Sequence, residues 1–516
     1  WATGTNWTVT GGSATGATPT LGNVATVVIP SGKTVDYGDA MAGLAPTSGV
    51  AITNDGGVSF TNTSAVTLPS VISGAGAVTM AGTAPVTLSG NNSYTGVTTI
   101  NNGATLKLGA SGVIPNSSAL VIDGTLDLAG YSETVGSISG SSTALITSTA
   151  AGTPVLTAGG DNTSTTYAGV IQNGTATTVA LTKVGTGTLS LTGTNTNTGE
   201  TNINGGVLKV ETDANLGAAT SLGFNGGTLE ITGSATFTST KNITLNGTAT
   251  INNTNTTNTS SFSGNVTNGA NLLTVDGAGN TTMSGNIGSG SGGLTKSGAG
   301  TLTLSGSNAY TGGTTINEGT LALGSTSALP TAGNVTINGS IGGTVLDLNG
   351  NSIDISSGTL TIAGSGISSV MSSSGTPTLK AASYTVTSTG TTTISVVLAD
   401  KTGTTSGLTM SGAGGTLNLN AANTYTGATT LSAGTIKLGT ANAIASSALN
   451  MSGSGYFDMA GYSVSLASLA GASGNKILNS VSGTSTLTVG GTATSTFAGI
   501  IEDKETGSSS TGVVAM

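Results

Sequence analysis

Carboxylates are the only side chains of this 516-residue chain that could perform acid–base chemistry. The sequence contains no His and no Cys, and its 11 basic residues are all Lys. This composition excludes Ser-His-Asp and Cys-His nucleophiles, zinc sites with nitrogen or sulfur ligands, and arginine clamps for phosphate. The net charge of −9 also argues against a nucleic-acid partner, because such binding depends on neutralising phosphates.

One acidic cluster near the end of the chain could hold a metal ion. Glu502, Asp503 and Glu505 surround Lys504, and oxygen ligands of this kind suit Ca²⁺. The calcium-binding repeat of β-helices, rich in Gly and Asp, is absent from the sequence. We therefore expect a solvated loop at this cluster. We predict no cofactor and no catalytic residue.

Two internal repeat periods determine the elements that must position these side chains. The copy LTKSGAGTLTLSGSNAYTGGTTINEGTLALG covers residues 294–324, and related copies cover residues 84–109, 181–210 and 408–439. The residue before the Thr-Gly pair of each copy gives long periods of 103, 113 and 115 residues. Inside one long unit, the pattern G-x-L-x-L begins at Gly187 and returns after 19 and then 21 residues.

Alternating residues predict short strands within each short period. In Thr301-Leu302-Thr303-Leu304 the leucines fall on one face and the threonines on the other. Tandem immunoglobulin-like sandwiches would match a unit of about 110 residues, but they give no reason for the shorter period. We therefore predict an all-β fold, a parallel β-helix (β-solenoid) with about 20 residues per turn and long repeats of about 110 residues.

Oppositely charged residues recur one predicted turn apart. The two members are 20 residues apart in Lys107 and Asp127, and 21 residues apart in the second and fourth repeats. Each lies at an outward position between two inward aliphatic residues, so a solenoid stacks the two side chains. We predict exposed ion pairs, each worth about 0–1 kcal/mol. The predicted pairs are Lys107 with Asp127, Lys209 with Glu230, and Lys437 with Asp458.

The third repeat lacks such a pair, since Ala322 occupies the position of the lysine opposite Asp347. The four acidic positions that recur once per long repeat are about five turns, or about 24 Å, apart along the axis. Glycosidic cleavage requires carboxyl groups within roughly 5–10 Å of each other. We therefore expect a structural role for these positions, which are Asp127, Glu230, Asp347 and Asp458.

Tyrosines also recur at repeat-determined positions. They could form an aromatic strip on which a glycan stacks, or they could pack the turns. Because the repeat determines their positions, we predict a packing role. The residues concerned are Tyr94, Tyr310 and Tyr425, together with Tyr131 and Tyr462.

These motifs resemble the autotransporter-associated β-strand repeat of bacterial surface and secreted proteins. The matching features are LTKxGxGTLxLxGxNxYTGxTTINxGTLxLG and the downstream segment GTLDLxGxS. The resemblance implies a right-handed parallel β-helix displayed on, or released from, the bacterial cell surface. It implies little about a ligand, because the repeat is a building element of passengers with many roles.

The repeats divide the chain into five expected segments. Residues 1–65 form a predicted N-terminal cap, which holds Trp1 and Trp7. The last repeat is expected to be open-ended, which allows head-to-tail self-association. No transmembrane segment is predicted, and a glycan or protein ligand stays unknown. The four expected β-helix units are residues 66–180, 181–293, 294–407 and 408–516.

The predicted function is that of a non-catalytic extracellular structural protein. It would serve as a β-helical surface stalk, an adhesin passenger or a filament subunit that stacks end to end. The alternative is a polysaccharide-active β-helix enzyme, a lyase or hydrolase that uses surface carboxylates. Such an enzyme would need several acidic groups to converge on one face.

Overall fold

The computed structural model describes residues 26–38, 51–339, 342–444, 447–491, 494–503 and 512–516. In this part the chain is an all-β parallel solenoid of about 22 turns with about 21 residues per turn. The predicted fold class is therefore confirmed. A short 3₁₀ helix, η2 (Asp213–Leu216), interrupts the strands, and no described helix is long and apolar enough to cross a membrane.

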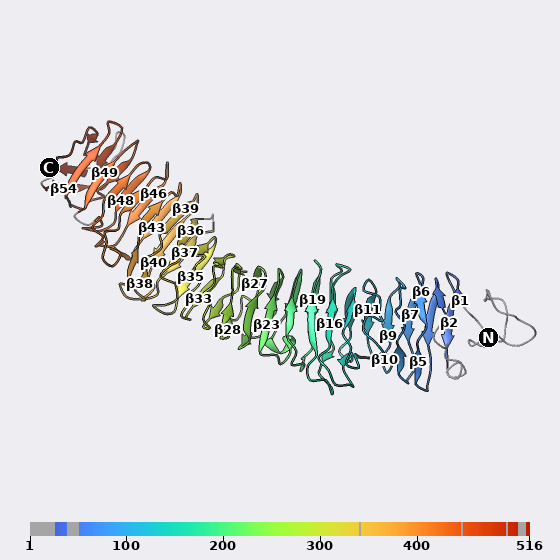
Figure 1. Ribbon diagram of the computed structural model, residues 1–516. Coiled ribbons are helices and arrows are strands. Elements are labelled where there is room, and N and C mark those ends of the chain that lie inside the picture. The colour runs from blue at the N-terminus through green and yellow to red at the C-terminus, as the bar shows by residue number, and fades with distance from the viewer. Residues whose placement is uncertain (1–25, 39–50, 340–341, 445–446, 492–493, 504–511) are drawn as a thin grey trace, which may run out of the picture. The chain divides into compact units, whose positions relative to one another are not determined.

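The chain divides into two compact units, residues 1–249 and 250–516. In the first unit, the strands β8 (Val86–Leu88), β10 (Thr105–Leu108), β12 (Thr125–Asp127) and β15 (Leu145–Thr147) pair in parallel, each with the next. The strands of successive turns follow one another in Figure 1. The register aligns one inward residue from each strand, and all four are buried: Val86, Leu106, Leu126 and Ile146.

A ladder of the same kind runs through the second unit. Its strands include β37 (Thr344–Asp347), β40 (Ser368–Met371), β43 (Thr391–Ile394), β46 (Thr416–Leu419) and β48 (Thr435–Leu438). The ladder continues through β50 (Tyr456–Asp458), β53 (Lys476–Leu478) and β55 (Ile500–Ile501).

The core of each unit follows directly from the alternating sequence. In β33 (Thr301–Leu304) the two leucines are fully buried and the two threonines are half-buried. Burial of one such leucine is worth about 1.5–3 kcal/mol. Each turn therefore contributes one thin apolar layer, which the adjacent turns cover.

The expected N-terminal cap is described only in part. Residues 26–38 and 51–65 contribute β2 (Thr34–Tyr37) and β4 (Gly57–Phe60), which pair in parallel with each other. Strand β4 then pairs with β7 (Ala77–Met80). Trp1 and Trp7 lie outside the described residues. The capping role and the boundaries of the four repeat units stay predictions.

Candidate functional site

The first of the repeated charged pairs lies on two neighbouring strands of the first unit. Strands β10 and β12 place Lys107 directly opposite Asp127 in the parallel register. The lysine Nζ is 3.7 Å from Asp127 Oδ2. The lysine side chain is 40% exposed and the aspartate side chain only 4%, so the acidic partner of this pair is buried. The sequence predicted an exposed pair, and that part of the expectation is wrong.

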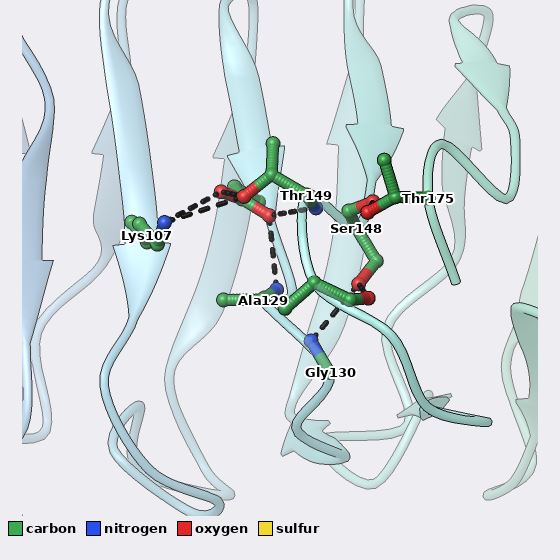
Figure 2. A network of polar contacts seen from close by, with 8 residues as sticks. Lys107, Ala129, Gly130, Ser148, Thr149 and Thr175 are labelled. Carbon is green, nitrogen blue, oxygen red and sulfur yellow. Dashed lines mark hydrogen bonds and ion pairs between the residues drawn. The ribbon is translucent and has the colours of Figure 1, made fainter.

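The Asp127 carboxylate is buried because backbone and hydroxyl donors surround it. Oδ1 accepts the N–H of Ala129 at 2.9 Å and the N–H of Thr149 at 2.8 Å, and Oδ2 accepts the Thr149 hydroxyl at 2.5 Å. Figure 2 shows Lys107, Ala129 and Thr149 converging on this carboxylate. Asp127 thus joins its own turn to the turn before and the turn after. We call this arrangement the carboxylate clamp.

The fourth repeat builds the same clamp. Lys437 Nζ lies 3.5 Å from Asp458 Oδ2, and the aspartate side chain is 7% exposed. Asp458 Oδ1 accepts the N–H groups of Ala460 at 2.9 Å and Ser480 at 3.0 Å, and Oδ2 accepts the Ser480 hydroxyl at 2.6 Å. The clamp therefore recurs at equivalent positions of two repeats and is a property of the repeat sequence.

The other two repeats show which parts of the clamp can change. Asp347 has no lysine opposite it, yet its Oδ1 still accepts the N–H of Asn349 at 2.8 Å and of Ser373 at 2.9 Å. Glu230 lies 3.2 Å from Lys209 and is more exposed, at 23% of its side chain. The backbone donors are thus kept in the third repeat without the ion pair.

The repeat carboxylates are too far apart to act together. Asp347 and Asp458 lie in the same sheet of the second unit, on β37 and β50, which are five strand spacings apart. At about 4.8 Å per spacing the separation is about 24 Å. Paired carboxylates that cleave glycosidic bonds lie within roughly 10 Å of each other. Each clamp therefore stands alone.

The repeat tyrosines Tyr94, Tyr310 and Tyr425 lie inside the solenoid with no exposed surface. Each hydroxyl bonds the threonine four residues later, at 2.6–2.7 Å. Burial raises the pKa of all three phenols above the ordinary value. A ring without exposed surface cannot stack on a glycan, which excludes the aromatic strip for these three. Tyr131 and Tyr462 are 40% and 37% exposed.

A buried asparagine in each repeat is the residue that the sequence reasoning missed. In the fourth repeat, Asn423 Oδ1 accepts the N–H of Leu398 at 2.8 Å from the preceding turn. Its Nδ2 donates to the carbonyl of Ala443 at 2.5 Å in the following turn. Equivalent bonds to both neighbouring turns are made by Asn92, Asn195 and Asn308.

The signal for this asparagine was present in the sequence. It stands two residues before the Tyr or Asn that precedes Thr-Gly in all four copies. Its amide offers an acceptor and two donors, which suits a position between two backbone segments. We call this arrangement the asparagine bridge.

Two lysines of the LTK segments are buried, although the sequence reasoning left them aside. Lys296 is 2% exposed, and its Nζ donates to the carbonyls of Ser297 and Gly298, both at 2.6 Å, and of Glu318 at 3.3 Å. Burial lowers the pKa of Lys296 to about 8. Lys183 is similarly buried, and its pKa is lowered for the same reason. Met410 is buried at the position of Lys296 in the fourth repeat.

Glu133, in the first unit, is another buried ionisable group. It is 2% exposed, and its Oε2 accepts the N–H of Val113 at 3.0 Å and of Ile114 at 3.3 Å. Its Oε1 accepts the N–H of Thr134 at 3.0 Å. Burial outweighs these donors and raises the pKa of Glu133 to about 7.

The acidic cluster near residue 503 is only partly described. Glu502 Oε1 lies 3.2 Å from Lys476 Nζ, and Asp503 Oδ1 accepts the N–H of Val514 at 3.1 Å. Glu505 lies outside the described residues. Among the residues that the structure describes, no group of three or more His, Cys, Asp or Glu could hold a metal ion.

These features define a class, that of repeat β-solenoid proteins whose turns are joined by recurring buried polar side chains. Four segments match the passenger-associated-transport-repeat family: residues 78–108, 181–210, 294–323 and 408–438. The chain therefore carries four passenger-associated-transport repeats, which confirms the family that the motifs resemble. Comparison with curated proteins and with solved structures gives no match.

Replacement of the buried carboxylate should cost more than replacement of its lysine. Asp458→Ala leaves the N–H groups of Ala460 and Ser480 without their acceptor, which should lower the free energy of unfolding by about 1–3 kcal/mol. Lys437→Ala removes a side chain that is 41% exposed, and should cost about 0–1 kcal/mol. Urea denaturation of both variants measures the difference. Equal losses would contradict the clamp.

The asparagine bridge predicts a second loss of stability. Asn423→Ala leaves the N–H of Leu398 and the carbonyl of Ala443 buried without a partner, and should cost at least about 1–3 kcal/mol. The control is Asn420→Ala, because Asn420 is exposed in the same repeat. Thermal and urea unfolding should separate the two variants. Similar stabilities would show that the bridge contributes nothing.

Glu133 predicts a pH dependence of stability. Its pKa is about 7 in the folded protein against an ordinary value of 4.5, so the folded state binds this proton more tightly than the unfolded chain. The contribution of Glu133 is fully present below pH 4.5 and is lost as the pH rises to about 7, by about 3 kcal/mol in total. Glu133→Gln should abolish this slope. Parallel pH profiles of the two proteins would overturn the assignment.

Proposed function

We propose that this chain is part of a non-catalytic extracellular passenger that serves as a mechanically stable stalk. The repeat family is typical of autotransporter passengers at the cell surface or in the secreted fraction. The observation that carries the proposal is the asparagine bridge. In each of the four repeats, one buried side chain hydrogen-bonds the turn before and the turn after.

Such bridges suit a protein that must keep its turns together outside the cell. A single turn of a solenoid buries too little surface to be stable alone and depends on its neighbours. Hydrogen bonds between buried groups add geometric specificity. If a turn shifts relative to its neighbours, the buried donors and acceptors lose their partners. The carboxylate clamps add the same restraint at the outer surface of the turns.

The acidic side chains support the same proposal over the enzymatic alternative. In the first and fourth repeats, the repeated aspartate accepts three hydrogen bonds from its own and the next turn. A carboxylate engaged in this way is a structural acceptor. It has little freedom to act as a nucleophile or as a general acid.

Single-molecule pulling on the purified chain tests the proposal. We expect stepwise release of turns at forces that fall when the bridge or the clamp is removed, in Asn423→Ala or Asp458→Ala. The exposed-site control Asn420→Ala should leave the force pattern unchanged. Release of turns in wild type at the same forces as in both variants would overturn the proposed mechanical role.

Two further measurements separate the stalk from the other predicted roles. Electron microscopy should show isolated particles, whereas long uniform fibres would replace the stalk by a filament subunit. A reducing-end assay on a polysaccharide panel should show no turnover. Turnover that is lost in Asp458→Asn would establish the enzymatic alternative.

A further inference from the structure

A surface hollow in the fourth repeat has features that the other repeats lack. Its volume is about 230 Å³, and its walls are formed by Ala413, Gly414, Gly434, Thr435, Ser454 and Tyr456. These residues come from three successive turns of the second unit. The register places Thr435 opposite Tyr456.

Two sequence changes account for this hollow. The turn of the fourth repeat reads SGAGGT over residues 411–416, one Gly longer than SGAGT over residues 297–301. A Cβ built on the extra Gly414 would meet no atom within 4 Å, so this part of the turn borders open space. In addition, the third and fourth repeats differ at one register position. Val345 occupies this position in the third repeat, opposite Thr320, and Tyr456 occupies it in the fourth, opposite Thr435.

The Tyr456 ring has a charged neighbour in the following turn. Lys476 Nζ lies over the ring, 5.8 Å from its centroid, and Lys476 is opposite Tyr456 in the ladder. Thr435 and the three glycine and alanine walls come from the two preceding turns, whereas Ser454 belongs to the turn of Tyr456 itself. The lysine therefore covers part of the ring from the following turn, and the ring also forms part of the wall of the hollow.

The charges at the hollow are balanced. Lys476 pairs with Glu502 at 3.2 Å, and none of the six wall residues carries a charge. The walls offer the hydroxyls of Thr435 and Ser454 as donors and acceptors. The ring offers an electron-rich face that attracts positively polarised C–H groups. An aromatic face beside neutral hydroxyls suits a ligand with one C–H face and hydroxyls at its rim.

We propose that this hollow is a binding site for a single neutral pyranose ring, which stacks on the ring of Tyr456. The volume is below the roughly 300 Å³ at which pockets begin to accept drug-sized ligands, so one ring fits and a second remains in solvent. The site adds recognition of a glycan end or branch to the structural role of the chain. It does not depend on that role.

The test uses the methyl β-pyranosides of glucose, galactose and mannose as probes. Saturation-transfer NMR on the full chain should show saturable binding of at least one of them, with a dissociation constant of about 1–10 mM, as expected for so few contacting atoms. The bound sugar protons on one face should shift upfield through the ring current of Tyr456. No saturable binding of any of the three would overturn the proposal.

Three variants locate the site. Tyr456→Val introduces the residue that the third repeat carries in this register, so the fold is kept, and binding should fall at least tenfold. Ala413→Leu should block the hollow while the tyrosine stays. Tyr462→Val removes a tyrosine that is 37% exposed in the same repeat but outside the hollow, and should bind as wild type does.

Other results would identify a different ligand class. Binding that is unchanged in Tyr456→Val would place the sugar elsewhere and overturn the proposal. Methyl glucuronide that binds ten times more tightly than the neutral pyranosides would show that the site prefers a charged ligand. This result would overturn the proposal of a neutral ligand. Circular dichroism of each variant excludes loss of fold as the cause of lost binding.

Discussion

Hydrogen bonding between successive turns is the constraint on which the rest of this protein depends. Parallel pairing sets each strand opposite the strand one turn away, and the interior between them is filled by single aliphatic residues such as Leu106 and Leu126. A polar group that is buried in this interior needs a hydrogen-bond partner. A buried donor or acceptor without a partner costs about 1–3 kcal/mol. The turns between strands therefore need side chains that satisfy both neighbours. Asn423 and its three counterparts do this with one amide each.

This constraint also explains why the ionisable groups serve architecture. The buried aspartates hold backbone N–H groups of two turns, and the buried lysines hold backbone carbonyls, as Lys296 does with Ser297 and Gly298. Met410 replaces that lysine in the fourth repeat and is equally buried. The position thus requires a long, slender side chain, and a charge is tolerated only where its end reaches carbonyl groups. Burial of Lys296 lowers its pKa to about 8, which shows that the charge is held at a cost.

The differences among the repeats mark where a solenoid can acquire a new property. Asn197 stands in the place of the repeat tyrosine and bonds the carbonyl of Val179 at 2.8 Å, so the turn closes without an aromatic ring. Asp347 keeps its backbone donors without a lysine. The extra Gly414 is different, because an added residue in a turn opens space and leaves the strand register intact. Such insertions can therefore vary a solenoid surface with little effect on its core.

The sequence by itself determined the fold class, the turn length and the partners within each charged pair, because strict alternation and a period of 19–21 residues admit one register. The recurring asparagine of the N-x-Y-T-G segment is also visible in the sequence. A single sequence, however, does not show which of its polar residues are buried. Only the tertiary structure decided which of the polar residues are buried. Backbone and hydroxyl donors of two turns enclose Asp127, while Lys107 stays exposed. The tertiary structure likewise places Tyr456 in the wall of a surface hollow while Tyr425, in the same repeat, is fully buried.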